Sequence, residues 1–325
     1  MKPPSESRDP KRVATPNPFS RREKGGTFSP LPTGEGLGVR VAIMLLVFTL
    51  PVFAQNLKEP EKAKEIARKM IKRDDGKTSY NRTKVITCAF DEQGGKRKCS
   101  GQARTKSFES ISKDIGPQLE DTIGLSIIDD PADEKGTAFL QKDYEVPGKD
   151  TEQWMYLPAL KKLKRVVAET SNSPKTGTLF GSEIAYEDIE KVRMSDYVYS
   201  YLGEENVDGR PCYILESFPT AYRAPKSSYG RGVLWVDKAS YLVLKSDSYD
   251  RQNRLVKTFF SKDLEVVGGV AVAKQLIVVN HKNRRMSLMK LEKVKINVPI
   301  PEARFDTRAV QDSAFRESQM GAVRN

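Results

Sequence analysis

The sequence contains few residues of the types that carry out acid–base or metal chemistry. Its single histidine is His281, beside a basic turn. A His-based triad, a multi-histidine metal site or a histidine proton relay therefore has almost no material in this chain. The glycine-rich phosphate loops and the Cys-x-x-Cys pair are also missing from the sequence. We therefore expect no enzyme activity, no metal site and no cofactor.

The three cysteines point to disulfide chemistry instead. If Gln93 and Gly94 form a two-residue turn, Cys88 and Cys99 face each other across a hairpin. In an oxidising compartment such a pair favours a disulfide, and the alternative is two reduced thiols on one sheet face. Cys212 lies in an apolar run, where we expect a buried small hydrophobic side chain.

The N-terminal region has the pattern of an export signal. Residues 1–40 show no apolar periodicity, and we expect them to be disordered or to precede the true translation start. Residues 41–54 are uncharged and follow Arg40, and a small-residue cleavage site precedes Gln55. This pattern predicts a signal peptide, because a membrane-spanning helix needs about 20 apolar residues. A retained membrane anchor is the alternative.

The formal net charge of the chain is +12. Basic clusters lie at 96–98, 161–165 and 281–285, all at predicted bends. Basic residues at turns are usually solvated surface. The other interpretations are an anionic membrane surface or a nucleic acid, and export argues against nucleic acid.

The elements that must position any site are mostly strands. Apolar residues at helical spacing predict a first helix over 58–73, and short β-rich runs alternate with turn signals after it. The short connections favour antiparallel neighbours. We predict thirteen strands, at 82–91, 96–109, 121–129, 136–145, 152–157, 162–169, 196–206, 209–218, 230–237, 240–250, 253–266, 269–281 and 284–297.

Several of these strands are apolar on both faces. In one of them Val233 and Trp235 share a face, while Leu234 and Val236 share the other. A flat sheet with one solvent-exposed face would not need apolar residues on both sides of its strands. The pattern favours a strongly curved sheet or a barrel that holds something inside.

A long polar loop follows the strand at 162–169 and ends in an apolar tip around Leu179 and Phe180, with Ile184 close behind. Such a tip is either tucked into the core or covers a cavity. The first helix, with Ile66 and Met70, is a second candidate cover. We expect the tip to act as a gate, because small hinge residues flank it.

Six segments resemble the landmarks of the outer-membrane lipoprotein-sorting family, in the LolA-like carrier superfamily. The motifs are individually weak, but their order and spacing are fairly specific, and the resemblance covers about residues 58–311. One departure is Glu183-Ile184, where members often carry Asp-Phe. The segments are 130–133, 136–140, 154–158 followed by 164–166, 180–189, 208–213 and 234–237.

The resemblance implies a mainly β domain over 55–311: a curved antiparallel sheet that forms an unclosed β-barrel, with helices covering the opening. We expect residues 312–325 to be a disordered tail. The resemblance also implies a periplasmic carrier of lipid or lipoprotein acyl chains. Its implied partners are an inner-membrane exporter, sometimes of the RND type, and an outer-membrane acceptor, with transient membrane contact.

The alternative function is a periplasmic sensor or protein-interaction module of the same fold that carries no cargo. For the carrier, the expected binding residues are apolar side chains from the first helix, the strand at 152–157, the loop tip and the strand at 230–237. They are Ile66, Met70, Met155, Leu157, Leu179, Phe180, Ile184 and Trp235.

Overall fold

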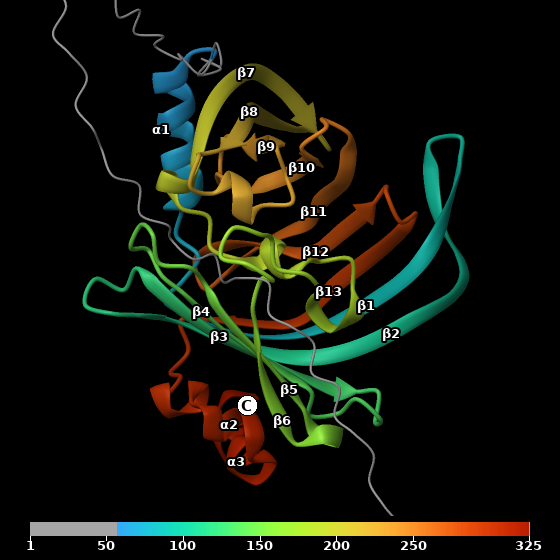
Figure 1. Cartoon of the computed structure of the whole chain (residues 1–325), viewed down its shortest axis with the longest axis vertical. Coiled ribbons are helices and arrows are strands. Elements are labelled where there is room, and N and C mark those ends of the chain that lie inside the picture. Colours follow the sequence, from blue (N-terminus) through green and yellow to red (C-terminus); the bar gives the residue numbers. More distant parts are fainter. Residues whose placement is uncertain (1–56, 325) are drawn as a thin grey trace, which may run out of the picture. The chain divides into compact units, whose positions relative to one another are not determined.

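The computed structural model describes residues 57–324, and in this range the chain forms one 13-stranded antiparallel sheet (Figure 1). The strand order is β6-β5-β4-β3-β2-β1-β13-β12-β11-β10-β9-β8-β7, so almost every strand pairs with its sequence neighbour. The exception is β1, which pairs with both β2 and β13 at the middle of the sheet. The segments predicted over 1–40 and 41–54 lie outside the described residues.

The predicted number and order of strands are confirmed. Their ends shift by a few residues, most clearly in the second strand, which continues to Ile115. The strands are β1 (Thr78–Gln93), β2 (Lys96–Ile115), β3 (Asp121–Asp130), β4 (Ala138–Asp143), β5 (Glu152–Leu157), β6 (Lys162–Val166), β7 (Tyr197–Val207), β8 (Arg210–Pro219), β9 (Arg231–Asp237), β10 (Val243–Tyr249), β11 (Leu255–Val267), β12 (Val270–Asn280) and β13 (Arg285–Ile296).

The first hairpin corrects one detail of the sequence prediction. Gln93 pairs with Lys96, so the turn residues are Gly94 and Gly95, both with positive φ, rather than Gln93 and Gly94. Two glycines suit a turn that needs positive φ at both central positions. Cys99 pairs with Phe90 in the ladder, and Cys88 lies at an irregularity of the pairing between Thr87 and Ala89. The Cys88–Cys99 disulfide has a Cα–Cα distance of 5.6 Å. The third cysteine, Cys212, is a buried free thiol.

The first helix, α1 (Pro60–Ile71), begins at a proline, whose missing N–H costs nothing in the first turn. Its buried face consists of Ala63, Ile66 and Ala67. These side chains pack against β7, β8 and β9 in a cluster with Tyr199, Leu215 and Val236.

The sheet is curved and unclosed, because β6 and β7 are its two edges (Figure 1). We call the face that α1 covers the inner face. A long loop between β6 and β7, residues 167–196, returns across the same face and covers β1 to β5 there. Helix and loop therefore occupy the inside of the unclosed barrel, and the predicted fold class is confirmed.

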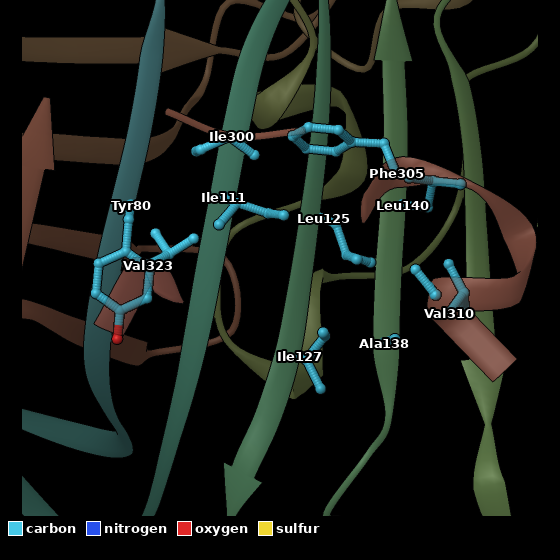
Figure 2. Close-up of a cluster of buried hydrophobic side chains, with 11 residues drawn as sticks. Tyr80, Ile111, Leu125, Ile127, Ala138, Leu140, Ile300, Phe305, Val310 and Val323 are labelled. Carbon is cyan, nitrogen blue, oxygen red and sulfur yellow. The ribbon is translucent and has the colours of Figure 1, made fainter. Parts of the chain in front are cut away.

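The outer face of β1 to β4 carries the C-terminal segment. Ile300, Phe305 and Val310 pack on Ile111 and Leu125 in one buried cluster (Figure 2). The segment includes α2 (Thr307–Gln311) and α3 (Ser313–Arg324).

The predicted disordered tail over 312–325 therefore differs from the structure, which has a helix there to Arg324. Val323 of this helix is 4% exposed and joins the outer cluster, while Arg324 pairs with Glu109 at 2.5 Å. Contacts to strands more than 200 residues earlier hold this helix, and a local sequence pattern does not reveal them.

Candidate functional site

A cavity of about 260 Å³ lies on the inner face between α1, the loop and strands β7 to β11. One side of it is apolar, with Met70 from α1, Leu234 from β9 and Val243 from β10. Tyr199 and Phe259 add aromatic surface to this side. A space with this lining can take up an apolar chain, although its volume lies just below the about 300–1,000 Å³ of small-molecule pockets.

The other side of the cavity is polar and comes mainly from the loop. Glu187, Asp188 and Glu190 line it, together with Arg223 from the segment between β8 and β9. Burial raises the pKa of the Glu187 carboxyl above its ordinary value. Its oxygens accept hydrogen bonds from the Ser227 hydroxyl, from the Ser228 N–H at 2.9 Å and from Arg223 at 3.4 Å.

The apolar tip of the loop is part of the core. Leu179 and Phe180 are 7% and 5% exposed and pack against Val85 and Phe108 on the inner face. The Phe108 and Phe180 rings meet edge to face with centroids 5.2 Å apart. The structure therefore favours the first of the two alternatives for the tip, burial in the core.

Tyr186 fixes the path of the loop next to the tip. Its ring stacks on Phe139 with centroids 5.3 Å apart. Gly177 passes so close to this ring that an added Cβ would lie 2.5 Å from it. Its φ of +110° is also a conformation that side chains disfavour. The glycine thus permits a close approach of loop and ring and does not act as a free hinge.

Two ion pairs anchor the loop to the far half of the sheet; the first is buried, and the second joins a buried glutamate to a half-exposed arginine. Asp188 accepts a hydrogen bond from Lys257 of β11 at 2.6 Å, and the two side chains are 4% and 9% exposed. Glu183 accepts from Arg285 of β13 at 2.6 Å and from Asn280 at 2.8 Å. Removing one partner of such a pair leaves a buried charge without compensation. The loop is therefore a fixed wall of the cavity.

Of the eight residues predicted to bind, Met70 lines the cavity. Ile66 lies on the buried face of α1, and Met155 of β5 packs beside the loop tip. Leu157 is half-buried at the end of β5, while Ile184 is 3% exposed. Most of the predicted residues therefore lie on the inner face. Apart from Met70, they pack around the cavity and do not line it.

Trp235 lies on the other face of β9. It belongs to a cluster with Cys212, Val233 and Leu244, whereas its neighbour Leu234 lines the cavity. Its indole N–H donates to Glu205 at 2.8 Å. Successive strand residues point to opposite faces, so Trp235 is not in the cavity lining.

Sequence reasoning missed most of the lining, including Tyr197, Leu234, Val243, Phe259 and Arg223. The alternation on β9 separates Leu234 from Trp235, but it does not say which face is inside. For Arg223, in a loop between strands, the sequence carries no signal.

Residues 57–324 contain neither a metal-binding cluster nor a membrane-spanning helix. Within that range, no group of three or more His, Cys, Asp or Glu side chains is arranged to hold a metal ion. No helix of the described chain has the length and apolarity to cross a membrane.

Comparisons with known proteins give a family and a fold. A family model described as "Uncharacterized protein" matches residues 120–312. No curated protein matches. A solved DUF1329 family protein from Desulfovibrio piger has 29% identity and a TM-score of 0.69, covering 78% of this chain and 100% of its own.

Two further solved structures are similar. A domain from Vibrio parahaemolyticus, assigned to outer membrane lipoprotein sorting, has 28% identity and a TM-score of 0.67, covering 78% of this chain and 99% of its own. A LolA superfamily protein from Nitrosomonas europaea has 21% identity and a TM-score of 0.52, covering 77% and 96%. The last of these supports the fold alone.

Proposed function

This chain belongs to the family matched over residues 120–312 and has the LolA-like fold, and on that premise we propose that it is a periplasmic carrier of acyl chains. The cargo is a lipid or the acyl part of a lipoprotein. The site is the cavity between α1, the loop and β7 to β11. Its role is binding and release, with no chemical step.

One observation carries this proposal: the inner face is not filled by side chains alone. The loop tip packs over β1 to β5 and α1 packs over β7 to β9, and the space of about 260 Å³ lies between them. Protein interiors are close-packed, so a cavity of this size with an apolar wall marks a place for a ligand. Burying an acyl chain there gains about 25 cal/mol per Å² of apolar surface removed from water.

The lipoprotein-sorting assignment of the Vibrio parahaemolyticus domain suggests the route of the cargo. We propose that the carrier receives it from an inner-membrane exporter, for which the RND type is a candidate, and delivers it to an outer-membrane acceptor. Contact with either membrane is transient. The predicted signal peptide supports the periplasmic location.

The first experiment is mass spectrometry of an organic extract of the protein purified from its native host. The carrier proposal expects an acyl lipid at a fixed ratio to protein. A sensor or interaction module of the same fold would yield no lipid beyond the level found with an unrelated periplasmic protein. That result would contradict the carrier proposal.

The second experiment fills the cavity. Val243→Phe places a larger side chain in the apolar wall, and Val198→Phe makes the same change on β7 at a side chain that is 37% exposed. We expect Val243→Phe to weaken binding of a fluorescent fatty acid by about tenfold or more, since each methylene kept out loses about 0.8 kcal/mol. Val198→Phe should bind like the wild type. Equal affinities for all three proteins would place the binding elsewhere.

A further inference from the structure

A second, polar cleft of about 330 Å³ lies beside the cavity. The loop after β6, from Val167 to Ser173, forms one wall of it. Its lining includes six basic side chains and four acidic ones, so its formal charge is positive. They are Arg165, Lys175, Lys191, Arg193, Arg223 and Lys226, with Asp150, Glu169, Glu190 and Asp196.

The cleft and the cavity are separated by a shared wall of side chains, which we call the partition. Glu190, Lys191, Asp196 and Arg223 line both spaces. On one side of the partition the lining includes Leu234, Val243 and other apolar side chains, and on the other side it is mostly polar. Two adjoining spaces of opposite character match the two parts of an amphiphile.

Arg223 is the central residue of this partition. The residue is 9% exposed, and it donates to Glu190 at 2.8 Å and to Glu187 at 3.4 Å. Its Nε–H is buried and has no hydrogen-bond partner within residues 57–324. A buried donor without an acceptor is costly, so a ligand oxygen at this position would be stabilising.

Glu190 already divides its charge between two cations. One oxygen accepts from Lys175 at 2.8 Å and the other from Arg223 at 2.8 Å. An anionic group in the cleft can replace Glu190 as the acceptor for one of the two cations. The other cation then stays paired with Glu190. Arginine is well suited to this exchange, because its planar fork matches phosphate and carboxylate oxygens.

We propose that the cargo is an amphiphile with an anionic headgroup, which binds in the cleft at Arg223 while its acyl chain occupies the cavity. The shared chemistry is a phosphate or carboxylate joined to an alkyl chain. Lys226, which pairs with Asp150 at 2.9 Å at the rim, assists through its charge. This inference rests on the proposed carrier function and narrows its substrate class.

The test compares three ligands with the same twelve-carbon chain by calorimetry below their micelle concentrations. Dodecyl phosphate is anionic, dodecyl maltoside is neutral and dodecyltrimethylammonium is cationic. We expect dodecyl phosphate to bind at least about tenfold more tightly than either of the others, the effect of one or two charge-assisted hydrogen bonds. Inorganic phosphate at the same concentration should bind too weakly to measure, because it has no chain.

Three variants assign the effect to the cleft. Arg223→Gln should remove the preference for dodecyl phosphate while changing dodecyl maltoside binding by less than about threefold. Lys226→Gln, which keeps the buried Arg223 in place, should reduce the preference in part. The control is Arg254→Gln, since Arg254 is an exposed cation of the β10–β11 turn and pairs with Asp250. It should retain the full preference.

The outcomes separate this inference from the carrier proposal. Equal affinity for the three headgroups would overturn the headgroup site and leave the carrier intact. Tight binding of inorganic phosphate would make the cleft a site for free anions and also overturn the inference. Failure of all three ligands to bind would contradict the carrier function itself. If Arg223→Gln does not fold, an undiminished preference in Lys226→Gln contradicts the proposal.

Discussion

At the scale of single residues, cysteine chemistry was the most predictable feature. The pairing of Cys88 with Cys99 followed from their positions on either side of a turn, even though the turn lies one residue further along than expected. In the ladder Cys99 pairs with Phe90, and Cys88 lies at an irregularity between Thr87 and Ala89 that no sequence rule placed. The disulfide was thus predicted correctly from a register that was wrong.

The first prediction concerns the number of free thiols. Titration of the unreduced protein in denaturant should find one thiol, from Cys212, and the folded protein should react slowly because this residue is 0% exposed. After reduction three thiols should appear. Finding three before reduction would show that Cys88 and Cys99 are not bonded.

The second prediction concerns pH and Asp143 of β4. This residue is 5% exposed, and burial raises the pKa of its carboxyl above the ordinary value of about 4. Because the pKa is raised in the folded state, the contribution of the Asp143 carboxyl to the free energy of unfolding is fully present below the unfolded-state pKa. It is lost as the pH rises through the folded-state pKa.

The measurement is urea unfolding of the wild type and Asp143→Asn at several pH values between about 4 and 7. The amide cannot titrate, so only the wild type responds to the charge of this carboxyl. The free energy of unfolding of the wild type should therefore fall relative to that of the variant as the pH rises. The opposite trend would mean that the hydrogen bonds from Gln141 and Thr151 to the ionised carboxylate outweigh its burial.

At the scale of elements, the strands could be predicted from the sequence, and the position of the loop could not. Alternation and turn signals are local, so they located β1 to β13 to within a few residues. The position of the loop depends on partners far away in the sequence, such as Lys257 for Asp188 and Arg285 for Glu183. The sequence showed an apolar tip, but it could not show that these ion pairs hold the tip against the core.

The third prediction tests this interpretation of the loop. Phe180→Asp buries a charge without a partner in the inner core, so it should lower the free energy of unfolding by about 4 kcal/mol or more. Val266→Asp on β11 is the control, because that side chain is 70% exposed, and its effect should be within about 0.5 kcal/mol.

Urea denaturation measures both variants, and fatty-acid binding is measured beside it. A gate would behave differently from a core element. If Phe180→Asp kept the wild-type stability and lost binding, the tip would be a mobile cover and its burial in the closed structure would be one of two states.

At the scale of the whole described domain, resemblance and physical reasoning gave the same fold. The unclosed antiparallel barrel was expected from the motif order, and strands apolar on both faces required something inside it. Trp235 was among the expected binding residues and lies on the face of β9 opposite the cavity, whereas its neighbour Leu234 lines the cavity. Which face of a strand is inner is a property of the assembled sheet.

The pairing of β1 with β13 has a consequence for the order of folding. It joins residues as distant as Thr87 and Ser287, whose hydroxyls meet although 200 residues separate them. All other strand pairs form between sequence neighbours. Contacts of long sequence separation form late because loop closure costs entropy, so β1–β6 and β7–β13 should assemble as two half-sheets first.

Until the halves meet, β1 and β13 are open edges and can template self-association. The cavity has walls from both halves, since the loop that follows β6 faces β7 to β11 across it. We therefore expect half-sheets that have not yet met to lack the proposed binding cavity, which would form in the same step that pairs the two open edges.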